Sequence, residues 1–279
     1  MSDDHRSSVV VIALLGNPFS PRYARARESG IANALDHCAM NVAVDGPGLS
    51  RWSLTERPGS SVARTRDHVA IGASAMRRRA DGSIVVDIDE RSAPWGTPLR
   101  GRITLRPRLE LATTVALDGE GAHVWSPRIP LARVEVDLVE PALSFTGNGY
   151  FDENAGDAPL ESAFTRWSWS RVSTGDEVAI AYDVALAGGR ALSHGVTGGT
   201  HVDLGRTRFG LPRAARVEAG APCRIVRTLE DGPFYARSVV ETSVGGRRAC
   251  GVHETVSLER FASRWVRFLL PFRMRVEAA

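Results

Sequence analysis

Alternating or β-branched runs recur along the chain and restrict it to a fold built from strands. They are rich in Val, Ile, Thr and aromatic residues, and they place apolar and polar side chains on opposite faces. The clearest runs lie at residues 84–90, 101–109, 131–139, 164–172, 178–186 and 234–244. Pairs that suit tight turns separate them, at Asp81-Gly82, Asp118-Gly119, Gly188-Gly189 and Gly245-Gly246. Strands at this spacing predict antiparallel sheets, as sandwiches or barrels.

Two segments break this pattern and predict helices. Residues 21–37 could carry a short helix, which Gly30 weakens because glycine is a poor helix former. Residues 257–272 favour a helix more strongly, and Pro271 is expected to end it. In this second segment the apolar side chains fall on one face and the arginines largely on another; the apolar residues are Leu258, Phe261, Trp265, Phe268 and Leu269.

The length of 279 residues, 43% of them hydrophobic, is enough for real cores. We expect an all-β chain of two antiparallel β-barrel or sandwich domains with a short C-terminal helix. The junction is predicted between Val139 and Gly147, which gives domains at residues 1–143 and 144–279.

Charge and cysteine content exclude several classes of protein. All 35 basic residues are arginine, and they nearly balance 32 acidic residues, so no nucleic-acid footprint is indicated. The three isolated cysteines suggest buried thiols and neither a disulfide framework nor a zinc site. The apolar run from Val9 to Leu15 is too short to span a membrane and is a poor secretory signal. We therefore expect a cytoplasmic protein.

An acidic stretch after Gly147, reading GNGYFDENAGDAPLE, begins like a calcium loop. An EF-hand needs an acid or amide at its fifth position, Gly at its sixth and Glu at its twelfth. Counting from Asp152, these positions hold Gly156, Asp157 and Ala163, so EF-hand calcium is rejected. The histidines have no metal-ligand spacing, no P-loop or dinucleotide fingerprint is present, and no G-x-S-x-G elbow suggests a serine hydrolase. No metal and no cofactor is expected.

Side-chain acid-base chemistry remains, and two pairs of residues could carry it. His123 and Trp125 are two residues apart, as are Tyr150 and Asp152. In strands, each pair would project onto one face of its sheet. From spacing alone, buried aromatic residues, a core histidine and a turn aspartate are the simpler interpretation.

Several motifs follow one another in a specific order: NPFSPRYARARESG from Asn17, LDHCAMNVAV from Leu35, RWSLTER from Arg51, IGAS from Ile71, GNGYFDENAGDAPLESAFTRWSWSR from Gly147, EDGPFYARS from Glu230, VHETVSLERF from Val252 and LPFRMR from Leu270. In this order they resemble the acyclic carotenoid 1,2-hydratases, also called hydroxyneurosporene synthases. The resemblance runs from about Asn17 to Arg275. It implies a two-part lipocalin-like fold, no cofactor, and addition of water across the terminal C1=C2 double bond of a linear carotene such as neurosporene or lycopene.

The resemblance also implies that an H-x-W pair and a Y-x-D pair are catalytic, which here are His123 with Trp125 and Tyr150 with Asp152. Hydration of an unactivated alkene needs a protonated acid, so Asp152 is the expected donor if burial or a carboxylate neighbour, Glu153 or Asp157, raises its pKa. Trp125 and Tyr150 would face the resulting cation. His123 would orient the water and accept its proton.

A carotene is insoluble and must enter from the bilayer, so a peripheral membrane contact is expected. The arginine-edged helix after Ser257 could rest on an anionic membrane surface, or it could pack against a barrel wall with its arginines in water. Two other functions stay open: a different cofactor-free terpenoid or polyketide cyclase or isomerase on the same fold, and a non-catalytic pigment or lipid carrier.

Overall fold

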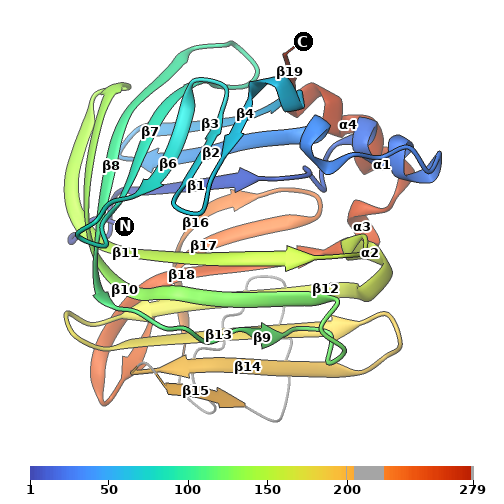
Figure 1. Ribbon diagram of the computed structural model, residues 1–279. Coiled ribbons are helices and arrows are strands. Elements are labelled where there is room, and N and C mark those ends of the chain that lie inside the picture. The colour runs from blue at the N-terminus through green and yellow to red at the C-terminus, as the bar shows by residue number, and fades with distance from the viewer. Residues whose placement is uncertain (199, 204–222, 278–279) are drawn as a thin grey trace. The chain divides into compact units, whose positions relative to one another are not determined.

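A computed structural model describes residues 1–198, 200–203 and 223–277, and strands dominate it (Figure 1). The chain groups into two compact units. Unit 1 contains residues 1–106, 133–147 and 267–279, and unit 2 contains residues 107–132 and 148–266. Each unit is therefore assembled from segments that are far apart in the sequence. The division into domains at residues 1–143 and 144–279 stays a prediction.

One sheet of unit 1 has the strand order β1-β2-β3-β19. Its strands are β1 (Ser8–Leu14), β2 (Cys38–Gly46), β3 (Leu49–Arg57) and β19 (Arg275–Val276). The first three pair antiparallel, whereas β19 pairs parallel to β3. Met40, Val42 and Val44 of β2 are fully buried and form part of the core.

A second sheet has the order β11-β10-β8-β7-β6-β5-β4, with β9 paired to β10. Its strands are β4 (Val62–Arg64), β5 (His68–Ile71), β6 (Ser74–Arg78), β7 (Ile84–Arg91), β8 (Pro98–Leu109), β9 (Val115–Ala116), β10 (His123–Glu140) and β11 (Leu143–Gly156). The long strands β8, β10 and β11 each contribute residues to both units.

The third sheet belongs to unit 2 and has the order β15-β14-β13-β12-β18-β17-β16. Its strands are β12 (Phe164–Ser173), β13 (Val178–Leu186), β14 (Ala191–Thr197), β15 (Thr200–Asp203), β16 (Arg224–Asp231), β17 (Tyr235–Val244) and β18 (Arg247–Ser257). Every pairing in it is antiparallel. Within the described residues the strand orders are open paths, so the all-β prediction is confirmed in its sandwich form.

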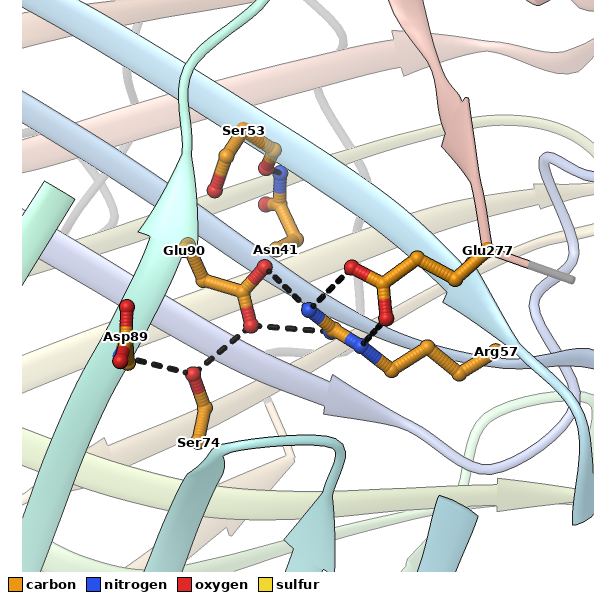
Figure 2. A network of polar contacts seen from close by, with 7 residues as sticks. All are labelled: Asn41, Ser53, Arg57, Ser74, Asp89, Glu90 and Glu277. Atoms are coloured by element: carbon orange, nitrogen blue, oxygen red, sulfur yellow. Dashed lines mark hydrogen bonds and ion pairs between the residues drawn. The ribbon is translucent and has the colours of Figure 1, made fainter. Parts of the chain in front are cut away.

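A buried ion network joins three distant segments of unit 1 (Figure 2). The guanidinium of Arg57 at the end of β3 donates to both oxygens of Glu90 on β7, at 2.9 and 3.1 Å. It also donates to Glu277, just after β19, at 2.8 and 3.1 Å. The Ser74 hydroxyl donates to Glu90 at 2.7 Å. Burial alone would lower the pKa of Arg57, but its hydrogen bonds with the two carboxylates raise it above the ordinary value.

The first predicted helical segment splits into α1 (Pro21–Glu28) and the 3-10 helix η1 (Ala34–His37). Ser20 caps α1 by accepting from the Tyr23 amide at 3.1 Å, and Pro21 suits the first turn. The helix ends before Gly30, whose φ of +69° favours glycine. The other short helices are η2 (Gly59–Ser61) and α2 (Leu160–Ala163).

The second predicted helix is also two helices, α3 (Leu258–Phe261) and α4 (Arg264–Arg273). Between them the Ser263 hydroxyl donates to the Arg260 carbonyl oxygen at 2.5 Å, a local bond that competes with helix continuation. The prediction that Pro271 ends the helix is wrong by two residues. Proline has a helical φ and costs one backbone hydrogen bond, which is tolerable this close to a helix end.

The residues of the predicted apolar face of this segment differ in burial. Leu258 and Phe261 of α3 are buried, whereas an apolar stripe of α4 is exposed. The exposed side chains are Trp265, Phe268, Leu269 and Phe272, at helical spacings of three and four residues. The part of the predicted apolar face on α3 is therefore packed, whereas the part on α4 is exposed.

Candidate functional site

Strands β10 and β11 carry all four predicted catalytic residues, and all four lie in unit 2. His123 and Trp125 stand at the start of β10, and both are buried because side chains two residues apart share a face of the sheet. Tyr150 and Asp152 stand two residues apart on β11 and are partly buried.

The indole of Trp125 brings three of the four residues together. Its N–H faces the Tyr150 hydroxyl oxygen at 3.1 Å and the Asp152 Oδ2 at 3.0 Å. The Asn154 amide also donates to Asp152 Oδ2, at 3.2 Å. The Asp152 carboxyl is thus held by an indole, an amide and the phenol of Tyr150, which hydrogen-bonds to it as well.

Burial is the main influence on the pKa values of Asp152 and Tyr150. It raises the pKa of Asp152 above its ordinary value, although the hydrogen bonds from Asn154, Tyr150 and Trp125 oppose the shift. It also raises the pKa of Tyr150 well above the usual phenol value, and the nearby charge of Asp152 adds to this effect. A carboxyl group that keeps its proton more readily than usual is suited to donate it.

His123 makes its hydrogen bonds to other residues than Trp125, Tyr150 and Asp152. Its Nδ1 lies 3.1 Å from Asp118 Oδ2, and its Nε2 lies 3.0 Å from the Ala158 carbonyl oxygen. Asp118 also accepts from the His123 backbone amide at 2.8 Å. Both ring nitrogens therefore face protein oxygen atoms, and the ring fastens the start of β10 to the segment after β11.

The acidic neighbours expected for Asp152 point elsewhere. Glu153 is exposed and accepts from Arg128 at 2.8 Å, because successive side chains of a strand alternate between faces. Asp157 is also exposed. Asp152 lies within strand β11, which continues to Gly156, and not in a turn. The pKa of Asp152 is raised by burial and not by either of these acids.

Aromatic side chains of the third sheet pack on the β10 and β11 cluster. Tyr182 of β13 meets Trp125 edge to face, with ring centroids 5.4 Å apart. Trp169 of β12 meets Tyr150 at 5.2 Å. Two electron-rich rings thus contact the Asp152 carboxyl within unit 2, and two more pack against those rings.

Arg171 of β12 lies beside these four rings, which form an aromatic wall. Its guanidinium carbon lies 5.8 Å from the Tyr150 ring centre, and it donates to the carbonyl oxygens of Pro130 and Gly149 at 2.9 and 3.0 Å. Burial lowers the pKa of Arg171 to about 10, so it stays charged at neutral pH.

A polar row on the same sheet was missed by the sequence motifs. Cross-strand register places Trp169 opposite Tyr182 on one side and opposite Glu254 of β18 on the other. Glu254 in turn lies opposite Arg237 of β17. Directly opposite residues share a face of the sheet. Glu254 lies in the VHETVSLERF motif, but nothing local assigns it a role, because its place beside Trp169 depends on pairing between strands about 85 positions apart in the sequence.

A cleft of about 370 Å³ opens beside His123 in unit 2. Its polar lining includes Asp118, Glu120, Ser162 and Arg190. Across the described part of the chain, no group of three His, Cys, Asp or Glu side chains is arranged to hold a metal ion.

Comparison with known proteins points to one family. The family model described as carotenoid hydratase CrtC matches residues 11–278. An acyclic carotenoid 1,2-hydratase of Thiocapsa roseopersicina is 42% identical over 98% of this chain and 70% of its own length. The corresponding protein of Rubrivivax gelatinosus is 37% identical over 98% of this chain and 71% of its own length.

A solved structure supports the fold alone. The crystal structure of a Nitrosomonas europaea protein assigned as AttH aligns with a TM-score of 0.53 and 12% sequence identity. The alignment covers 78% of this chain and 81% of that one. The similarity places the chain among lipocalin-like β folds.

Proposed function

Because the chain belongs to the carotenoid hydratase CrtC family, we propose that it is an acyclic carotenoid 1,2-hydratase. It adds water across the terminal C1=C2 double bond of linear carotenes such as neurosporene and lycopene, and the product is a 1-hydroxy carotenoid. The observation that carries this proposal is the Asp152 carboxyl, held 3.0 Å from the Trp125 nitrogen within a wall of aromatic rings.

Protonation is the first step. Asp152 in its acid form donates its proton to C2 of the substrate, which leaves a tertiary cation at C1. Burial favours that acid form because it raises the pKa of the carboxyl group. An Asp in water, with a pKa near 3.9, would be ionised and unable to protonate an alkene at neutral pH.

The cation is the intermediate that the site must stabilise. The faces of Trp125, Tyr150, Trp169 and Tyr182 are negative and offer no strong nucleophile, and a desolvated cation–π contact contributes roughly 2 kcal/mol or more. Trp125 and Tyr182 pack edge to face, and Tyr150 and Trp169 pack at a tilt. Water then captures the cation at C1 and yields a tertiary alcohol.

The contacts of His123 favour a positioning role over the predicted role of general base. Both ring nitrogens are engaged, with Asp118 and with the Ala158 carbonyl oxygen. The histidine therefore fixes the position of the start of β10, and with it Trp125, relative to β11.

Labelled water separates this function from its alternatives. The purified chain is incubated with lycopene or neurosporene in H₂¹⁸O, and the carotenoids are analysed by mass spectrometry. A hydratase yields a tertiary alcohol that carries the label, and Asp152→Asn abolishes this product while carotene binding persists. A cyclase or isomerase would give an unlabelled product, and a carrier would return the polyene unchanged. An active Asp152→Asn variant would reject Asp152 as the donor.

We also propose that the enzyme is peripheral on the inner or intracytoplasmic membrane, with α4 as its contact. None of the helices in the described residues combines the length and apolar character needed to cross a bilayer. The exposed apolar stripe of α4 is flanked by exposed Arg264, Arg267 and Arg273, a composition typical of helices that lie in an anionic membrane surface. An insoluble carotene would be taken up there.

Liposome flotation tests the contact. The chain is expected to float with vesicles that contain anionic lipid. The double variant Phe268→Ser/Phe272→Ser should lose this association, whereas Trp95→Ser, which removes an aromatic residue 87% exposed elsewhere, should keep it. Flotation that is equal for all three proteins would exclude α4 as the membrane contact.

A further inference from the structure

Glu254 faces the same aromatic wall as Asp152, from the opposite layer of unit 2. On β18 it stands directly opposite Trp169 of β12, whose ring contacts Tyr150 at 5.2 Å. The Cβ atoms of directly opposite residues are about 5 Å apart. The row continues to Tyr182, which contacts Trp125 at 5.4 Å. The side chain of Glu254 is therefore next to the rings of this wall.

The two carboxyl groups are close enough to affect each other. Burial raises the pKa of Glu254, and the charge of Asp152 raises it further. The Tyr182 phenol, in the row beside Trp169, responds to both: burial raises its pKa, and the charges of Asp152 and Glu254 add to the effect. A charge on one carboxyl group therefore disfavours the ionisation of the other.

The surroundings of the two carboxyl groups differ. Glu254 lies opposite the buried guanidinium of Arg237 and accepts a hydrogen bond from Tyr235. Both contacts favour its ionised form. The donors to Asp152, Trp125 and Asn154, also oppose its raised pKa, but they are neutral. Because Glu254 has a guanidinium opposite it and these donors to Asp152 are neutral, we assign Glu254 as the base of the pair and Asp152 as the acid.

We propose that Glu254 is the general base of the hydration reaction, an inference that rests on the proposed hydratase function. Asp152 donates its proton to C2, and the π electrons form the new C–H bond. A water oxygen attacks the cation at C1, and one water proton passes to the Glu254 carboxylate. The sum is alkene plus water to tertiary alcohol, and Glu254 returns the proton to Asp152 through solvent or the intervening phenol groups to complete the cycle.

The charged and titratable groups that face Glu254 come from every neighbouring strand. They are Tyr235 and Arg237 of β17, Glu230 of β16, Asp152 of β11 and Tyr182 of β13. His123 is absent from this set, and both of its ring nitrogens are engaged elsewhere. Glu254 is thus the base that the geometry offers.

The test is the pH profile of Glu254→Gln, a variant that keeps the size of the side chain and an oxygen to accept from Tyr235. We expect kcat to fall by roughly 10²- to 10⁴-fold with KM nearly unchanged. The acidic limb of the profile, which reports a base that must be ionised, should disappear, and the basic limb set by Asp152 should remain. Glu241→Gln, which removes a carboxylate on β17 paired with Arg248 and Arg224, is the matched control and should retain both limbs.

Folding and binding are measured beside activity, by thermal unfolding and by the absorption shift of bound carotene. Loss of turnover together with the acidic limb, in a folded variant that binds carotene, supports the proposal. Formate should restore part of the turnover of Glu254→Ala, because a small carboxylate can replace the missing base. Turnover of Glu254→Gln within about threefold of wild type, or an acidic limb that persists, would overturn the proposal while the hydratase function stands. If the wild-type chain forms no labelled alcohol, the hydratase function and this role both fall.

Discussion

At the scale of single residues, the indole N–H of Trp125 is the contact on which the site depends. One donor reaches both the Tyr150 oxygen and the Asp152 carboxylate, at 3.1 and 3.0 Å. Because one N–H lies within hydrogen-bond distance of both acceptors, it places the acid beside the neighbouring phenol. The indole also limits the rise in the pKa of Asp152, because burial raises this pKa and the hydrogen bond from Trp125 lowers it.

Trp125→Phe keeps an aromatic ring and removes that donor. We expect the pKa of Asp152 to rise further, and the basic limb of the kcat profile to move to higher pH. Turnover at neutral pH should fall roughly ten- to hundredfold, because the acid is less well positioned. Trp95→Phe, at an exposed indole, is the control. A basic limb that stays in place would show that the indole does not control Asp152.

Asp152→Asn should stabilise the fold at neutral pH while it abolishes activity. Burial raises the pKa of Asp152 in the folded state above its ordinary value of 3.8. Between these two pKa values the folded state binds more protons than the unfolded state, so the free energy of unfolding falls as pH rises through that window. Removing the titrating group should raise the unfolding free energy at pH 7 and leave it unchanged below about pH 3.5.

Denaturant unfolding of Asp152→Asn at both pH values checks this effect. Asp157→Asn, at an exposed acid of the same stretch, should change stability little. Equal or lower stability of Asp152→Asn at pH 7 would argue that its carboxyl group is not strained by burial.

At the scale of elements, strand β18 carries Glu254 and lies unusually close to β12. Gly251 stands opposite Val172 in their register. A Cβ at Gly251 would come within 1.8 Å of the Arg171 carbonyl oxygen. The two backbones approach closely only because this residue has no side chain, and that approach sets the position of Glu254 relative to Trp169.

Gly251→Ala should therefore push β18 away from β12. We expect a loss of about 1–3 kcal/mol in unfolding free energy and a drop in turnover, because Glu254 and Trp169 move apart. Gly175→Ala, in the turn after β12 with nothing within 4 Å of its added methyl group, should stay within about 0.5 kcal/mol of wild type. If both variants are equally stable, the close approach of the strands is not required.

At the scale of the whole molecule, each unit is assembled from segments that are distant in sequence. In unit 1 the Arg57 guanidinium connects β3 to β7 through Glu90 and to the end of the chain through Glu277, 220 positions away (Figure 2). Arg57 and Glu90 have side chains only 4% and 0% exposed, whereas Glu277 is 55% exposed. Breaking a buried pair leaves an uncompensated charge, which costs far more than losing an exposed one.

Glu90→Gln should lower the unfolding free energy by about 3 kcal/mol or more, and Glu277→Gln by under about 1 kcal/mol. Replacing both buried partners, as in Arg57→Met/Glu90→Leu, should recover most of the loss. Denaturant unfolding of the three variants gives these values. A double variant as unstable as Glu90→Gln would mean that the packing of this region, and not the buried charge, is the cause.

Much of the fold could be read from local patterns. Period-two runs predicted β7, β8, β10, β12, β13 and β17, because alternation reports which residues share a face of a strand. The glycine pairs lie between strands as expected; Gly82, Gly189 and Gly245 have positive φ there. The α4 stripe shows the limit of such patterns. Helical spacing says which side chains stand together, but burial of that face depends on what packs against it.

By itself, the sequence determined the strands, the turns, the family resemblance and the residue pairs on β10 and β11, because each of these depends on neighbours a few positions apart. Only the tertiary structure decided that Trp125 joins Tyr150 and Asp152 while His123 turns to Asp118 and Ala158. It alone placed Glu254 and Arg237 across the sheet from Trp169. The physical reason is that strand register and burial arise from long-range pairing, which desolvates both Asp152 and Glu254 and places Glu254 opposite a guanidinium.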